Sequence, residues 1–151
     1  MIEPNGPTIH ASAVLVGARA LLIRGPAGAG KSRLALSLLR AGAAKMLPFT
    51  RLVADDRTHV AATHGRLLVR PAPALAGMIE VRGLGLRVVP FEPVAVVGTI
   101  IDLAAETQRL PGHAGAQTVV EGIALPRLAV APGIDPLPAI LAMIHTKGLP
   151  A

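Results

Sequence analysis

The residues from 25 to 32 have the types and spacing of a phosphate-binding loop. They follow the pattern Gly-x-x-x-x-Gly-Lys-Ser and are Gly25, Pro26, Ala27, Gly28, Ala29, Gly30, Lys31 and Ser32. Glycines allow the backbone to curl so that successive N–H groups point at phosphate oxygens. Lys31 supplies a positive charge for the β- and γ-phosphates, and the Ser32 hydroxyl can ligate Mg²⁺. The pattern predicts a binding site for a nucleoside triphosphate.

The next charged pair follows at Asp55 and Asp56, where an apolar strand pattern over residues 51–54 ends. Beside a phosphate-binding loop, a carboxylate at the end of a strand holds Mg²⁺ or acts as a base. Two adjacent aspartates after a strand can instead begin a turn. Because adjacent side chains on a strand point in opposite directions, we expect the two carboxylates to have different roles.

Two further positions carry side chains that could take part in chemistry. His10 lies near the start of an apolar strand pattern over residues 9–16. A lone histidine there is more often structural, and this one gains weight because its strand is expected to pair beside the strand of the loop. Glu80 and Arg82 lie two residues apart on a strand pattern that runs into a Gly-x-Gly at residues 83–85. Either the glycines let the backbone approach a ligand, or this is an edge strand with solvated charges and a bulge.

The elements around these residues have the order that the chemistry needs. Residues 20–24 form a short buried-strand pattern before the loop, and residues 31–42 form a helix pattern after it, with Gly42 as the expected C-cap. The positive N-terminal end of such a helix favours phosphate. A Gly/Ala-rich linker could match the loop pattern by chance, but the strand before it and the helix after it argue against that explanation.

The rest of the chain adds more strand than helix. Further strand patterns are expected over residues 94–103 and 125–130, a hairpin over 58–62 and 66–70, and a closing helix over 137–145. Residues 106–122 are expected to form a loop with one short strand at most. The predicted fold class is therefore α/β, strand-rich with a few helices, in a single domain over residues 1–151.

Composition limits the partners. Hydrophobic residues make up 52% of the chain but aromatic residues only 1%, so the core must be aliphatic and base-stacking modules for nucleic acid are disfavoured. The net charge is +6 without a block of consecutive basic residues, which suits nucleotide phosphates or an acidic protein better than nucleic acid. There is no cysteine, and no apolar stretch approaches the roughly 18–20 residues needed to span a bilayer. We expect a soluble, cytoplasmic protein without a membrane partner.

Taken together, the charged positions resemble those of the HPr kinase/phosphorylase family, in its catalytic C-terminal domain and in the short form seen in α-proteobacteria. The matching segments are Ile9-His10, residues 25–32, Leu52–Asp56 and Ile79–Gly85, of which the Glu-x-Arg-Gly-x-Gly segment is the most specific. The resemblance extends from Ile9 to about Met143. It implies a P-loop-containing fold similar to phosphoenolpyruvate carboxykinase. It also implies phosphorylation, with ATP and Mg²⁺, of a serine in the phosphocarrier protein HPr of bacterial sugar transport.

The same resemblance implies roles for individual residues. Catalytic roles would belong to His10, Lys31, Asp56, Arg82 and, by a looser match, Arg109, and metal ligation to Ser32, Asp55 and Glu80. Asp56 would accept the proton of the target serine, and His10 would support it. Family members assemble as hexamers, which implies a homo-oligomer here. The N-terminal domain of the long members is not expected.

The sequence also departs from the family pattern. Arg33 follows Lys-Ser where the family usually has glutamate, residues 45–50 are additional, and residues 130–135 replace an arginine-rich turn associated with phosphate removal. The phosphorylase reaction is therefore in doubt. Two alternatives stay open: a nucleotide-binding regulatory module without catalysis, and a small-molecule kinase.

Overall fold

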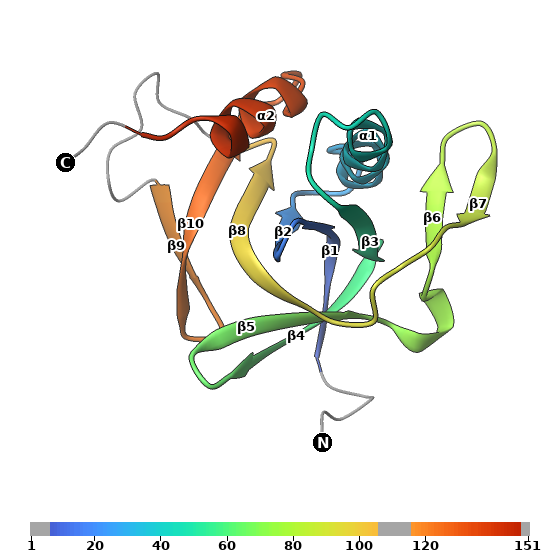
Figure 1. The fold of residues 1–151 in the computed structure, drawn as a ribbon. Helices are drawn as coiled ribbons and strands as arrows, with labels where there is room; N and C mark the ends of the chain where they lie inside the picture. Colours follow the sequence, from blue (N-terminus) through green and yellow to red (C-terminus); the bar gives the residue numbers. More distant parts are fainter. Residues whose placement is uncertain (1–6, 106–115, 149–151) are drawn as a thin grey trace.

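A computed structural model describes residues 7–105 and 116–148 of the chain, and the elements are labelled in Figure 1. The strands are β1 (Thr8–Val16), β2 (Arg19–Arg24), β3 (Thr50–Ala54), β4 (Arg57–Thr63), β5 (Arg66–Pro71), β6 (Met78–Val81), β7 (Gly85–Val88), β8 (Ala95–Leu103), β9 (Gln117–Val120) and β10 (Ile123–Val130). The helices are α1 (Lys31–Ala43), α2 (Leu137–His145) and a short 3₁₀ turn, η1 (Pro73–Leu75). The strand-rich α/β composition predicted from the sequence is confirmed.

Strand β1 organises the main sheet. It pairs with β2 along one edge, and along the other with β3 and, through its first residues, with β4. Strand β2 runs parallel to β8, which in turn pairs with β10 in parallel and with β5 in antiparallel orientation. Because β4 and β5 form a hairpin, these pairings close a ring through β1, β2, β8, β5 and β4. The phosphate-binding loop and the end of β3 thus lie on either side of β1.

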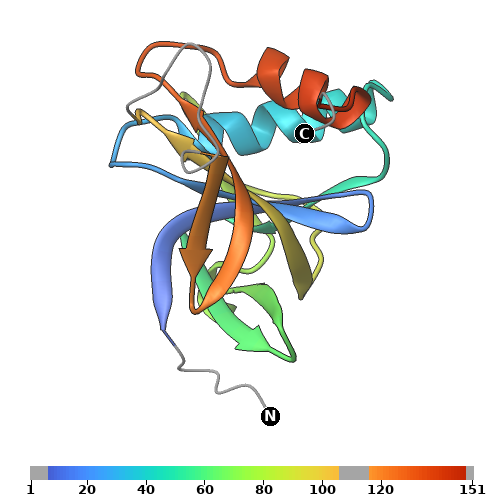
Figure 2. The ribbon, with the colours of Figure 1, turned by 90° about the vertical axis from the view of Figure 1, so that its left-hand side faces the viewer.

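Because successive side chains of a strand point to opposite faces of the sheet, the core divides into two clusters. In β2, Leu21 and Ile23 pack into the cluster that includes the helices, whereas Ala20 and Leu22 pack into the cluster inside the ring of strands. Both helices cover the same face of the sheet, as the side view shows (Figure 2). In the part of the chain that the structure describes, these clusters contain no aromatic side chain, in agreement with the aliphatic core expected from composition.

Helix α1 presents an apolar stripe, Leu34, Ala35, Leu38 and Ala41, to the sheet. The prediction that Gly42 caps this helix was wrong, because the helix continues to Ala43 and its C-cap is Ala44. Packing explains the glycine instead. A Cβ at Gly42 would lie 2.4 Å from the Cβ of Thr50, at the start of β3. Glycine therefore allows the end of α1 to lie directly against β3.

The other predicted helices and strands agree with the structure to within a few residues at their ends, and α2 has the predicted bounds. Of the loop predicted over residues 106–122, residues 106–115 lie outside the described residues, and the remainder contains the short strand β9. Around Glu80 and Arg82, the single strand pattern proves to be the hairpin of β6 and β7, which stands apart from the main sheet (Figure 1). Its turn is closed by the Leu84 N–H, which donates to the Val81 carbonyl at 2.9 Å. No helix in the described residues has the length and apolar character needed to cross a membrane.

Candidate active site

The predicted phosphate-binding loop connects β2 to α1. Gly30 is the N-cap of α1 with a φ of 99°, a left-handed conformation that glycine adopts without steric cost. No side chain caps the first turn of the helix, so its N–H groups are available to an anion. Within the loop, the Ala29 N–H donates to the Pro26 carbonyl at 3.1 Å and holds the curl. The backbone conformation is therefore suited to phosphate.

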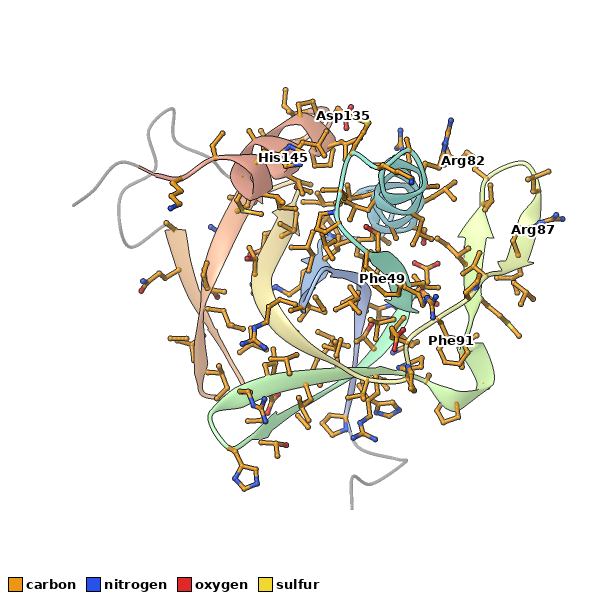
Figure 3. The ribbon with its side chains drawn as sticks, viewed as in Figure 1. Phe49, Arg82, Arg87, Phe91, Asp135 and His145 are labelled. Carbon is orange, nitrogen blue, oxygen red and sulfur yellow. The ribbon has the colours of Figure 1, made fainter. Side chains whose placement is uncertain are left out.

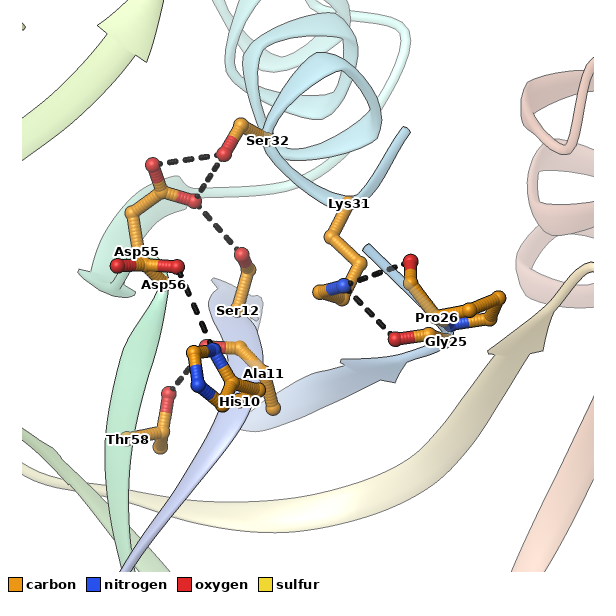
Figure 4. Close-up of polar contacts among 10 residues, drawn as sticks. All are labelled: His10, Ala11, Ser12, Gly25, Pro26, Lys31, Ser32, Asp55, Asp56 and Thr58. Atoms are coloured by element: carbon orange, nitrogen blue, oxygen red, sulfur yellow. Dashed lines mark hydrogen bonds and ion pairs between the residues drawn. The ribbon is translucent and has the colours of Figure 1, made fainter. Parts of the chain in front are cut away.

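Lys31 places its ammonium group against the loop. Its Nζ donates to the carbonyl oxygens of Gly25 at 2.8 Å and Pro26 at 3.1 Å (Figure 4). An ammonium group has three N–H donors, so one remains for a ligand beside the loop. The positive charge of Lys31, predicted from the motif, thus lies beside the curled backbone of the loop.

Asp55 joins the loop to the central strand. Its carboxylate accepts hydrogen bonds from the hydroxyl of Ser32 at 2.8 and 2.9 Å and from the hydroxyl of Ser12 on β1 at 2.6 Å. Its Oδ2 also accepts from the backbone N–H of Glu80 at 3.2 Å. Only 4% of Asp55 is exposed. A buried carboxylate beside a serine hydroxyl offers the hard oxygen ligands that Mg²⁺ prefers.

Asp56 has the opposite environment. Its side chain is 66% exposed, and its Oδ1 lies 3.7 Å from Nδ1 of His10, which is 63% exposed (Figure 4). A left-handed φ of 69° turns the chain at Asp56, so that β4 can start at the next residue. Thr58 then fixes β4 to β1, because its Oγ1 donates to the Ala11 carbonyl at 2.8 Å. As expected from the sequence, the two adjacent carboxylates lie in different surroundings.

The remaining predicted residues are only partly brought together. Glu80 reaches Asp55 through its backbone amide, while its side chain is exposed. Among the residues described, no group of three or more His, Cys, Asp or Glu side chains is positioned to hold a metal. Arg82 is exposed in the turn of the β6–β7 hairpin (Figure 3). Arg109 lies outside the described residues.

Sequence reasoning missed Ser12, although the structure places it at the centre of the site. Ser12 is fully buried, and its hydroxyl holds the same carboxylate oxygen as Ser32 does. The available signal was a single hydroxyl in an otherwise apolar strand, two residues after His10. His10 and Ser12 therefore both contribute to the site from the same face of β1, His10 as an exposed side chain and Ser12 as a buried one.

Sequence reasoning also missed a charged group next to the loop, where β2 ends. Asp102 on β8 accepts hydrogen bonds from Arg24 at 2.8 Å and from Arg127 at 2.5 Å. Burial raises the pKa of Asp102, but the hydrogen bonds and charges of the two arginines outweigh it, so that the pKa is lower than the ordinary 3.8. This group ties together three parallel strands, β2, β8 and β10, at the base of the loop.

Comparisons with known proteins point to one family. The family model described as HPr Serine kinase C-terminal domain matches residues 5–91, which include the loop, both aspartates and Glu80. An HPr kinase/phosphorylase of Limosilactobacillus reuteri is 29% identical over 136 residues, covering 82% of this chain and 40% of the relative. That of Clostridium tetani is 39% identical over 82 residues, covering 54% of this chain and 25% of the relative.

A solved structure has the same fold. The Hpr(Ser) kinase/phosphatase from Coxiella burnetii superposes with a TM-score of 0.72 at 24% identity, over 92% of this chain and 88% of that one. The chain spans two fifths or less of the length of the two relatives named above. The family match covers more than half of the chain, and the chain therefore belongs to the HPr serine kinase C-terminal domain family.

Proposed function

We propose that this chain is an ATP-dependent protein serine kinase and that its target is an HPr-type phosphocarrier protein. Family membership and the names of the relatives support the reaction and the target. The observation that carries the proposal is the pair of unlike carboxylates at the end of β3. One is buried against the loop serine, and the other is exposed beside a histidine. A phosphoryl transfer site needs both a metal-holding group and an accessible base.

The phosphate side of the reaction would use the loop. Its N–H groups and Lys31 would bind the β- and γ-phosphates. Ser32 and Asp55, already 2.8 Å apart, would hold Mg²⁺, and Glu80 is proposed as a further ligand. When bound, Mg²⁺ supplies positive charge that offsets the charge of the phosphates. Because Asp55 is rigidly held by Ser12 and by the Glu80 N–H, it would present its oxygens without reorganisation.

The protein side of the reaction would use Asp56. The oxygen of the target serine bonds to the γ-phosphorus, the bond from that phosphorus to the bridging oxygen of ADP breaks, and the serine proton passes to the Asp56 carboxylate. His10, 3.7 Å from that carboxylate, would orient it as a positioning residue. Arg82 and Arg109 are proposed to offset charge on the phosphoryl group.

Several finer points belong to the same proposal. The fold is assigned to the P-loop, phosphoenolpyruvate carboxykinase-like class on the basis of its loop between β2 and α1 and its family. We further propose a single catalytic domain over residues 1–151, assembly as a homo-oligomer, and a cytoplasmic location where ATP is available. Phosphorylase activity is not part of the proposal, because residues 130–135 carry no arginine.

The test is phosphoryl transfer to a purified HPr-type phosphocarrier in the presence of ATP and Mg²⁺, followed by intact-protein mass spectrometry. We expect a single phosphate on a serine, lost with Lys31→Ala and with Asp56→Asn. Asparagine tolerates the left-handed backbone at residue 56, so this variant should retain the fold. Glu121→Gln is the matched control, because it neutralises another exposed carboxylate that also has a left-handed φ.

The outcomes separate the candidate functions. Transfer that persists in both variants would refute the assigned roles. Binding of ATP without transfer to the phosphocarrier would favour the regulatory nucleotide-binding module. In that case, transfer to a small molecule would be the next assay.

A further inference from the structure

The hairpin of β6 and β7 exposes three large aliphatic side chains to water. Leu84, in its turn, is 67% exposed, and Leu86 and Val88 on β7 are 65% and 84% exposed. Among the described residues, β7 pairs with β6 alone, so its other edge also presents backbone groups outside any ladder. Clustered apolar side chains beside such an edge are typical of a surface that another chain covers.

The hairpin is fixed to the rest of the protein from its opposite face. Ile79 is 1% exposed and packs in the core cluster that includes α1, and Val81 and Val89 pack against the same cluster. At the base of the hairpin, the Val89 N–H donates to the Gly77 carbonyl at 2.8 Å. The exposed aliphatic side chains therefore belong to a segment whose position is held, and a partner would meet a preformed surface.

Strand register places these side chains beside a candidate active-site residue. Glu80 on β6 lies directly opposite Leu86, and Val88 is two residues further along β7. Residues opposite each other, and alternate residues of one strand, share a face of the hairpin. Glu80, Leu86 and Val88 therefore share one face, which we call the hairpin face. Because the Glu80 N–H donates to Oδ2 of Asp55 at 3.2 Å, a partner on this face would lie beside Asp55.

We propose that the hairpin face docks the protein substrate, through a surface of that substrate that carries aliphatic side chains surrounded by carboxylates. The inference rests on the proposed function, because it assumes that the phosphoryl group passes to a protein. It adds the surface that selects this substrate and the chemistry that the substrate must present. Binding energy obtained on the hairpin, away from the reacting atoms, would position the target serine at Asp56.

The position of the hairpin supports this occupant. Asp55 and Asp56 lie together on one side of Lys31 (Figure 4). The contact between Glu80 and Asp55 places the hairpin on that side as well. A protein docked on the hairpin face would therefore reach the exposed carboxylate of Asp56 without crossing the phosphate-binding loop.

Charge and access argue against a second copy of this chain as the occupant. Arg82 and Arg87 both lie on the hairpin (Figure 3), and the chain has a net charge of +6. Pairing of two hairpins would bring the arginines of both copies close to one another, which is unfavourable. A copy held there would also cover the Glu80 side chain and block a protein substrate. An acidic protein has charges complementary to the two arginines.

The test is steady-state phosphorylation of a purified HPr-type phosphocarrier by the full chain, with ATP and Mg²⁺ at saturation. The double variant Leu86→Thr/Val88→Thr keeps residue types that favour a strand but replaces aliphatic surface with hydroxyl groups. We expect the KM for the phosphocarrier to rise by roughly five- to tenfold, with kcat and the affinity for ATP within about twofold of the wild type. The matched control is Val119→Thr, because Val119 is 66% exposed on the short strand β9, far from the hairpin (Figure 1).

A second variant tests the charge of the partner. Arg87→Gln should raise the same KM by roughly two- to fivefold at low ionic strength, and the rise should disappear in about 0.5 M salt, where exposed charges are screened. Thermal unfolding should be unchanged in all of these variants, since the altered side chains are exposed. If the double variant is less stable, the single variant Val88→Thr provides the same comparison with Val119→Thr.

The outcomes separate the inference from the proposed function. A rise in KM confined to the hairpin variants supports docking on the hairpin face. If the wild type phosphorylates the phosphocarrier and the double variant has the same KM, or loses kcat alone, the inference is wrong and the kinase function stands. If the wild type binds ATP but transfers no phosphate to the phosphocarrier, both fail. Dissociation of a wild-type oligomer in the double variant, seen by analytical ultracentrifugation, would overturn the inference and assign the hairpin face to a contact between copies.

Discussion

Asp55 is the residue whose replacement most directly tests how the site is built. The structure predicts that alanine and asparagine at this position have unequal effects on stability. Alanine removes every acceptor of the carboxylate, which receives the hydroxyls of Ser12 and Ser32 and the N–H of Glu80. Asparagine keeps the shape of the side chain and one acceptor oxygen.

The expected loss of stability depends on which hydrogen-bond donors lose their acceptor when Asp55 is replaced. Ser12 is fully buried, so in Asp55→Ala its hydroxyl has no access to water, at a cost of about 1–3 kcal/mol. The Ser32 hydroxyl and the Glu80 N–H are partly buried and can recover part of their loss through water. With the lost packing added, we expect Asp55→Ala to reduce the free energy of unfolding by about 2–4 kcal/mol.

Asparagine should cost less, because its oxygen can accept the Glu80 N–H and its amide can donate to the Ser12 hydroxyl. What is lost is the contribution of the negative charge to these hydrogen bonds, about 1–1.5 kcal/mol. Asp56→Asn is the matched control. Its carboxylate is 66% exposed, so the free energy of unfolding should change by no more than about 0.5 kcal/mol.

The assay is urea denaturation at pH 7, together with thermal unfolding. For a chain of this length, each kcal/mol corresponds to roughly 2–4 °C in Tm. The reasoning is refuted if Asp55→Ala is no more destabilising than Asp56→Asn, or if asparagine at residue 55 costs as much as alanine. The first result would mean that the buried hydrogen bonds to Asp55 do not stabilise the fold. The second would mean that asparagine replaces none of them, so that their contribution depends on the carboxylate charge.

Three further predictions concern the support of the site. Gly42→Ala should lower the free energy of unfolding by about 1–3 kcal/mol, because the new Cβ would lie 2.4 Å from the Cβ of Thr50, although alanine normally favours a helix. In urea denaturation, the double variant Gly42→Ala/Thr50→Gly should recover part of this lost stability. The pKa of Asp102 is lowered in the folded protein, so its ionised carboxylate stabilises the fold above pH 3.8, and this stabilisation is lost as the pH falls through the lower folded pKa. The free energy of unfolding, measured between pH 7 and pH 2, should therefore fall at the acid end, and it should fall less in Asp102→Asn. At pH 7, Asp102→Asn should itself lower the free energy of unfolding by roughly 2 kcal/mol, which is less than the loss expected from breaking a fully buried ion pair. An unchanged Tm would contradict this expectation. Thr58→Val should lower the free energy of unfolding by about 1–2 kcal/mol in urea denaturation, because the buried Ala11 carbonyl loses its donor. Thr63→Val, at the half-buried end of β4, should be nearly neutral.

The local elements were predictable because their signals are local. The loop pattern between a strand and a helix, the β4–β5 hairpin and helix α2 each depend on residues that are neighbours in the chain. Gly42 shows the limit of this reasoning. Its sequence context indicates a helix end, but the contact that requires glycine comes from Thr50, beyond the helix and the connection that follows it.

The hairpin of β6 and β7 shows a related limit. Charges at Glu80 and Arg82 indicated either a ligand-binding segment or an edge strand, and strand periodicity alone does not decide between them. The structure gives an edge hairpin whose Glu80 backbone amide nevertheless contacts Asp55. The contact with Asp55 is made by a backbone group that no sequence pattern identifies, and the approach of this segment to a ligand stays a prediction. The roles of the Glu80, Arg82 and Arg109 side chains stay predictions.

By itself, the sequence determined the residue types of the site, the family that carries them, and the order of strand, loop and helix around the phosphate-binding loop. Only the tertiary structure decided that Ser12 and Ser32, which lie 43 and 23 residues before Asp55, share one of its carboxylate oxygens. The reason is that β1 pairs with β2 along one edge and with β3 along the other, so the ends of two strands distant in sequence meet across it. Spacing along a chain predicts neighbours within one element, whereas contacts across a sheet depend on strand order and register.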